Sequence, residues 1–111
     1  MGACSFMTIA YGKSLSEAYQ NAVDEAIDYY GHDPYNGTIS TTYGCRNVYC
    51  DLGKGPKWTQ TKENKAFKLA GQLIGSMDKR ECKGIDLGQV SNRIIHHNGW
   101  HKYLLFGWAA E

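Results

Sequence analysis

The sequence predicts a single α+β domain in which an antiparallel sheet is packed by two helices. Three observations support this class: a capped amphipathic helix after a short N-terminal strand, a second helical pattern in the middle, and an almost wholly apolar C-terminal segment. The chain has 111 residues and a mass of 12.4 kDa. That length forms one domain, residues 1–111, with no room for a second.

The first helix has the clearest local signals. Residues 3–10 form an expected strand that ends at Tyr11-Gly12, and Ser14 and Glu17 then have the spacing of a capping box. Apolar residues recur at three- and four-residue steps from Leu15 to Tyr30, which predicts one buried stripe. Gly31 is placed to end the helix.

The middle of the chain predicts a hairpin followed by a helix. Residues 38–43 are β-branched and favour a strand, and residues 46–52 are expected to return as its partner. After a loop at 53–58, apolar spacing predicts a helix over 62–79.

The last third predicts short strands. Residues 85–87 form one candidate, and residues 93–97 and 100–108 flank Asn98-Gly99, a strong hairpin signal. Residues 103–108 are apolar enough for a buried central strand. The expected order is β-α-β-β-α-β-(β-β), with both helices on one face, similar to a ferredoxin-like arrangement.

Composition excludes several classes of protein. Twelve Lys and Arg nearly balance eleven Asp and Glu, so the chain as a whole is neither a basic nucleic-acid coat nor an acidic DNA mimic. No apolar run approaches the length of a membrane span, and the N-terminus has no secretory pattern. We therefore expect a cytoplasmic protein without membrane contact.

The four cysteines, Cys4, Cys45, Cys50 and Cys82, are expected to be free thiols in that compartment. Together with the histidines they leave a zinc site open as an alternative, although their spacing matches no standard template. No cofactor motif is present, so neither a cofactor nor a metal is expected.

Charge is unevenly distributed along the chain. Residues 1–40 hold one Lys and five acids, a net charge of −4, whereas residues 41–111 hold eleven bases and six acids, a net charge of +5. Five lysines cluster between Lys54 and Lys68. The uneven charge permits self-association. The lysine cluster is interpreted as a solvated face, an anion site or a docking surface for a partner.

Three segments carry a resemblance to a protein family. They are Gly-Ala-x-Ser-Phe at 2–6, Tyr-Gly-His-x-x-Tyr-x-Gly-Thr-Ile at 30–39, and Tyr-Leu-Leu-Phe-Gly-Trp-Ala at 103–109. With these the chain resembles a group of short accessory proteins encoded by tailed bacteriophages, over about a quarter of its length. The resemblance implies an agent against host defence that either sequesters a nucleotide immune signal or blocks a defence protein. It supplies no reaction.

Three groups of residues are candidate sites. Rings in the loop after the first helix could stack on a base, and the Thr38 hydroxyl in that loop could donate a hydrogen bond. Cations beside Trp58 could neutralise phosphates. The histidines at 96, 97 and 101, with a nearby Asp, could act in acid–base chemistry. The residues expected to bind a ligand are His32, Tyr35, Thr38, Arg46, Lys57 and Trp58.

These candidates predict a binding protein rather than an enzyme. The first hypothesis is a homo-oligomer that sequesters a nucleotide-type host signal without turning it over, in a pocket between subunits. The alternatives are a protein–protein inhibitor of a defence effector such as a CRISPR nuclease, docking through Asp24, Glu25 and Asp28 or through the lysine cluster, and a small hydrolase of a nucleotide signal.

Overall fold

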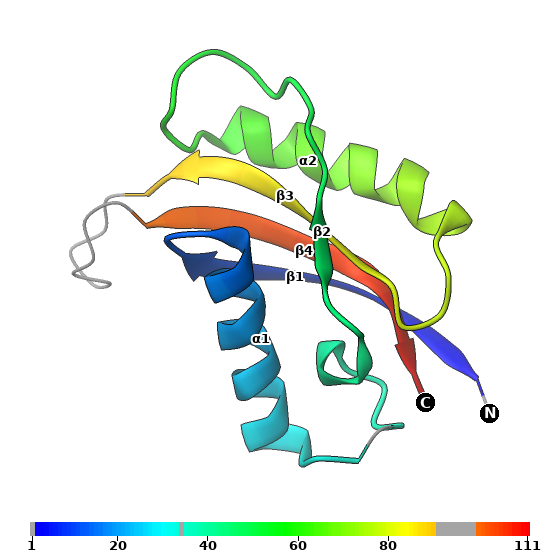
Figure 1. Ribbon diagram of the computed structural model, residues 1–111. Helices are drawn as coiled ribbons and strands as arrows, with labels where there is room; N and C mark the ends of the chain where they lie inside the picture. The colour runs from blue at the N-terminus through cyan, green and yellow to red at the C-terminus, as the bar shows by residue number, and fades with distance from the viewer. Residues whose placement is uncertain (1, 34, 91–99) are drawn as a thin grey trace.

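In the computed structural model the chain forms one sheet with a helix on each side (Figure 1). The structure describes residues 2–33, 35–90 and 100–111. The described elements are β1 (Ala3–Gly12), α1 (Leu15–Tyr30), the 3-10 turn η1 (Ile39–Thr41), β2 (Cys45–Asn47), α2 (Gln60–Leu73), the 3-10 turn η2 (Ile74–Ser76), β3 (Cys82–Gln89) and β4 (His101–Ala110). The predicted α+β class is confirmed.

The sheet is mixed, so the expectation of a purely antiparallel sheet is wrong. Its strand order is β1-β4-β3-β2, with β4 antiparallel to both of its neighbours. β2 runs parallel to β3, with Cys45 opposite Cys82. The segment between them contains α2, and a helical crossover is the usual way to join parallel strands.

The two helices cover opposite faces of the sheet, and the expectation that both lie on one face is also wrong. Side chains of β4 alternate between the faces, as the pleat requires. Leu104 and Phe106 pack in the core under α2, whereas Tyr103 and Leu105 pack in the core under α1. β4 is therefore the buried central strand that its apolar sequence predicts.

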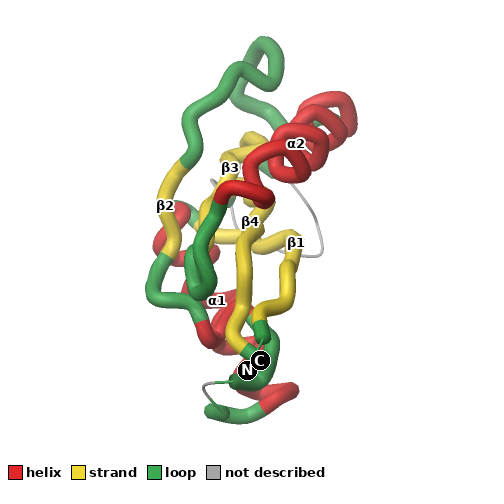
Figure 2. Tube along the Cα trace, turned by 90° about the vertical axis from the view of Figure 1, so that its right-hand side faces the viewer, coloured by secondary structure: helices red, strands yellow, loops and turns green. Residues whose placement is uncertain are grey.

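The segment between α1 and α2 differs most from expectation. Residues 38–43 contain the turn η1 and form no strand, because hydroxyl groups satisfy the backbone locally. Thr41 Oγ1 donates to the Thr38 carbonyl (2.8 Å) and Thr42 Oγ1 to the Ile39 carbonyl (2.6 Å). Of residues 46–52, only the first two belong to β2, which pairs with β3 and makes no hairpin. Figure 2 shows the chain leaving β2 in a long loop before it enters α2. The observed order is thus β-α-β-α-β-β, not the ferredoxin-like one.

The helix signals are confirmed with adjusted bounds. Ser14 caps α1 by accepting from the Glu17 N–H (3.2 Å), and Gly31 follows its last residue with φ +79°. α2 ends at Leu73, short of the expected residue 79. β3 is longer than residues 85–87, and the expected strand at 93–97 lies outside the described residues. Among the described helices, none is long and apolar enough to cross a membrane.

Candidate functional site

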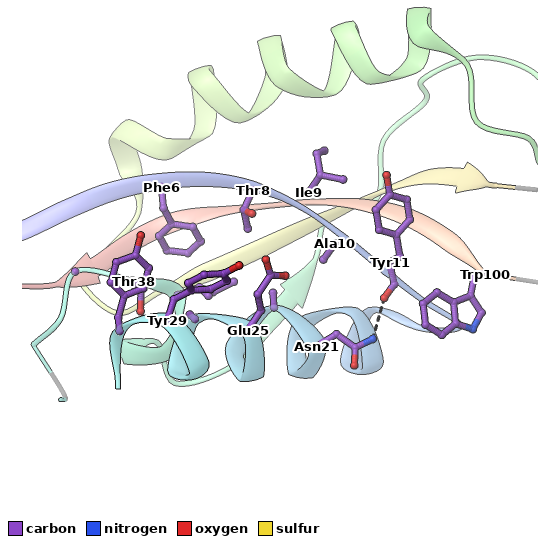
Figure 3. A pocket seen from close by; sticks show the side chains of 15 residues that line it. Phe6, Thr8, Ile9, Ala10, Tyr11, Asn21, Glu25, Tyr29, Thr38 and Trp100 are labelled. Carbon is purple, nitrogen blue, oxygen red and sulfur yellow. Dashed lines mark hydrogen bonds between the residues drawn. The ribbon is translucent and has the colours of Figure 1, made fainter. Parts of the chain in front are cut away.

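A groove of about 870 Å³ lies between β1 and the outer side of α1 (Figure 3). β1 supplies Phe6, Thr8 and Ala10, which share one face of the strand. α1 supplies residues spaced by four, so they form one row along the helix: Asn21, Glu25 and Tyr29. Thr38, one of the predicted ligand residues, also lines the groove.

The outer edge of β1 carries backbone groups that no described strand pairs with, because β1 ends the strand order. The hydrogen bonds of β4 show which residues point outward. Opposite Ala3, the Ala110 N–H donates to Thr41 Oγ1 and its carbonyl accepts from Gly37. The backbone N–H and C=O of Ala3 therefore point away from β4.

The same orientation recurs at every second residue. Opposite Ser5, the Trp108 N–H donates to the Glu81 carbonyl and its own carbonyl accepts from Arg80, so Ser5 also faces outward. Alternation along the strand extends this set to Met7, Ile9 and Tyr11. The Tyr11 carbonyl confirms it, since it accepts from Asn21 Nδ2 of α1 (3.0 Å).

This edge also lacks the devices that usually protect a free strand. The ten residues of β1 include no charge and no proline, whereas free edges commonly carry lysine, proline or a bulge. The groove beside it is lined by Glu25 and by the exposed residues Tyr29 (78%) and Tyr30 (66%). An extended peptide chain with apolar and basic side chains fits such a surface.

A second hollowed region surrounds Arg80, and we call it the Arg80 cleft. The Arg80 guanidinium carbon lies 5.1 Å from the ring centroid of Tyr35 and 5.3 Å from that of Tyr43, and Nη1 donates to the Thr41 carbonyl (3.1 Å). Lys79 Nζ lies 6.0 Å from the Tyr35 ring. Two hollows of about 440 and 270 Å³ adjoin Arg80; Arg46 lines the first and His32 the second.

The predicted ligand residues fall into three places. His32, Tyr35 and Arg46 lie around the Arg80 cleft, whereas Thr38 lies in the groove. Lys57 and Trp58 do not join either group. The backbone N–H of Arg80 donates to the Trp108 carbonyl near one end of β4. The Trp58 ring lies 4.6 Å from Lys102 Nζ near the other end of that strand. Trp108 and Lys102 are ~20 Å apart at the usual rise of a strand.

Trp58 has structural partners of its own. Its Nε1–H donates to Glu63 Oε1 (3.2 Å), and Lys57 forms an isolated bridge with Gln89 of β3. Sequence reasoning missed Arg80 and Tyr43 as site residues. The sequence predicts a strand at Tyr43, and Arg80 carries no local signal, since its positive φ of 69° is a property of the folded turn.

One contact in the structure bears on the hypothesis that the histidines act in acid–base chemistry. His101 Nδ1 lies 2.9 and 3.0 Å from the two carboxylate oxygens of Asp86. Burial, followed by the charge of Asp86, raises the pKa of the neighbouring Tyr103 to about 12. Among the hydrogen bonds of the described chain, none joins His101 to a hydroxyl or thiol, so this pair has no nucleophile in hydrogen-bond contact. Residues 96 and 97 lie outside the described residues.

The residues that the structure describes include no group of three or more metal-ligating side chains. No protein-family model, curated protein or solved structure matches the chain. Function is therefore inferred from the groove along β1 and from the Arg80 cleft.

Proposed function

We propose that this protein is a non-catalytic binding module that takes an extended segment of a partner protein as an additional strand on β1. The observation that carries the proposal is the outward edge of β1: ten uncharged residues beside an open groove. Backbone hydrogen bonds along such an edge supply affinity, and pockets for alternate side chains supply selectivity.

Charge complementarity favours a basic partner over a second copy of this chain. Glu25 lines the groove, and Asp24 and Asp28 lie on the same helix. A second copy paired through its own β1 about a two-fold axis would bring its acidic α1 to the same face of the joined sheet. A segment that carries Lys or Arg meets opposite charge there instead.

The biological setting of this proposal comes from the resemblance to phage accessory proteins. In that setting the partner is a bacterial defence effector, such as a CRISPR nuclease, and binding takes place in the cytoplasm of the infected cell. Addition of a strand would hold a segment that the effector needs for its own activity.

A peptide panel tests the proposal. Ten-residue strand-forming peptides, alternating Val and Thr and bearing two Lys, two Glu or no charge, are titrated by fluorescence anisotropy. We expect the Lys peptide to bind at least ~10-fold more tightly than the Glu peptide. On binding, hydrogen exchange should slow at the outward amides of Ser5, Met7 and Ile9.

A matched pair of variants locates the site. Met7→Pro removes an outward N–H while leaving the β4 ladder intact, so it should weaken peptide binding by ~10-fold or more. Met7→Val keeps the amide and should bind as the wild type does. Equal binding by both variants, or slowed exchange of these amides in a peptide-free dimer, would overturn the proposal.

A second candidate function rests on the Arg80 cleft, which brings two rings together with Arg46, Lys79 and Arg80. Here we propose sequestration of a nucleotide-type ligand, with its base on an exposed ring and its phosphates near the cations. Asp78 and Glu81 line the same hollow, so the phosphates belong nearer Arg46 than the acids. A pocket completed by a second copy of the chain would also recruit Lys57 and Trp58.

Thermal shift with a panel of cyclic and linear nucleotides tests this candidate. A sequestered nucleotide raises Tm and is recovered with unchanged mass after the complex is heated. Tyr43→Ala, at a ring 84% exposed, should abolish the shift without lowering the Tm of the free protein. A product of altered mass would indicate the hydrolase instead, and no shift with any nucleotide would remove this candidate.

A further inference from the structure

Cys45 and Cys82 form a pair of opposed thiols between β2 and β3. They are direct partners in the parallel register, and their sulfur atoms lie 3.1 Å apart. Neighbouring strands are separated by about 4.8 Å, which falls within the Cα spacing that a disulfide requires, about 4.4–6.8 Å. A bond between these sulfurs therefore needs a shift of side chains rather than a rearrangement of the sheet.

The two thiols differ in environment. Cys82 is 1% exposed, whereas Cys45 is half-buried, and both line the 440 Å³ hollow beside Arg80. The Cys82 S–H donates to Cys45 Sγ, and this bond together with burial raises the pKa of Cys82. Cys82 thus keeps its proton, and Cys45 is the sulfur that a reagent entering the hollow meets first.

The walls of the hollow indicate which reagent fits. Three cations, Arg46, Lys79 and Arg80, line it together with the two cysteines, and the acids Asp78 and Glu81 reduce the net charge of the lining to +1. This excess of positive charge favours a small disulfide that carries carboxylates. Among the described cysteines, Cys45 and Cys82 are the pair with sulfurs in contact.

We propose that Cys45 and Cys82 are a reversible thiol–disulfide site, oxidised by an anionic low-molecular-weight disulfide. The Cys45 thiolate attacks one sulfur of the reagent, forming a mixed disulfide and releasing one reagent thiolate. Cys82 then gives its proton to the released reagent thiolate and attacks Cys45 Sγ, which expels the second reagent sulfur as a thiolate. In balance, two protein thiols are oxidised to one disulfide while one reagent disulfide is reduced to two thiols.

The bond would act on the shortest strand of the described sheet. β2 has three residues, and its partner cysteines are 37 residues apart in sequence, so the disulfide would close a long loop that includes α2. It would also fix the chain next to Tyr43 and Arg46, which line the Arg80 cleft. The inference is independent of strand addition, since β1 lies at the other edge of the sheet.

The test uses a variant that leaves the pair intact. In Cys4→Ser/Cys50→Ser, equilibrated with glutathione and glutathione disulfide, mass spectrometry should show loss of two hydrogen masses and no glutathione adduct. The oxidised form should have a Tm higher by ~5 °C or more, because closing the loop constrains the unfolded chain. Addition of reduced glutathione should restore both thiols.

Two comparisons make the result decisive. In Cys4→Ser/Cys50→Ser/Cys82→Ala the second step is blocked, so a glutathione adduct should accumulate on Cys45. In urea the intact pair should form its disulfide at least ~10-fold less readily, because native pairing no longer holds the sulfurs together. Two thiols that stay free or carry only adducts in the native protein, or equal yields with and without urea, would overturn the proposal.

Discussion

At the residue scale, burial separates lysines that look alike in the sequence. Lys62 belongs to the lysine cluster predicted as a solvated or anion-binding face, yet its side chain is buried. Its Nζ donates to the carbonyls of Gly55 and Lys57, both at 2.6 Å, and so holds the loop before α2 in place. A lysine gives no sequence signal for this role, because its partners are backbone groups that only the folded loop brings together.

Glu63 gives a pH-dependent prediction. Its burial alone would raise its pKa, but the ion pair with Lys102 and the hydrogen bonds from Trp58 and Gln60 outweigh this, and the pKa lies below its ordinary value of 4.5. A carboxylate with a lowered folded-state pKa stabilises the fold above its unfolded pKa, and this contribution is lost as the pH falls through the lower value. Glu63→Gln should therefore cost about 1 kcal/mol at pH 7 and much less at about pH 3.

Urea unfolding at the two pH values measures this difference. Asp28→Asn is the matched control, because Asp28 is exposed and makes no ion pair within the described chain. The control should show a small change in the free energy of unfolding at both pH values. A cost for Glu63→Gln that stays the same in acid would contradict the linkage.

At the scale of elements, local signals were predictable and pairing was not. α1 was predicted correctly because its cap, its apolar stripe and its terminal glycine are all encoded within the helix itself. The threonine-rich segment at 38–43 favoured a strand by composition, but hydroxyl bonds within the segment stabilise a turn. The parallel pairing of β2 with β3 depends on residues 37 apart, which no local pattern reports.

The same distinction explains the candidate site. Tyr35 and Arg46 are predicted from their chemistry, and the fold places both beside Arg80. Trp58 is predicted for the same reason, but the loop from β2 to α2 carries it to the far end of the sheet. Residue type predicts which side chains can bind a base or a phosphate. The strand order decides which of those side chains lie close together.

At the scale of the whole molecule, β4 joins two cores into one structure. An uninterrupted apolar run such as residues 103–107 is typical of a strand covered on both faces, and the two helices on opposite sides of the sheet provide that cover. Leu105 contributes to the core under α1, and Phe106 to the core under α2. Each core therefore depends on the same strand.

A pair of core variants tests this dependence. Leu105→Ala should cost about 3 kcal/mol and Phe106→Ala about 4 kcal/mol, since both side chains are fully buried. In each variant, circular dichroism and tryptophan fluorescence should report a single coincident transition. Tyr49→Ala, at a ring 88% exposed, is the control and should change stability by less than about 0.5 kcal/mol. Separate transitions for the two probes would show that the cores unfold independently.

The unequal ends of the sheet set a limit on assembly. β1 offers ten residues to an incoming strand, whereas β2, at the opposite border, offers three. The described sheet therefore offers one long edge to an added strand, so a complex should contain one partner segment per protein. A fibrous polymer would need a second long edge on each copy, which β2 does not provide.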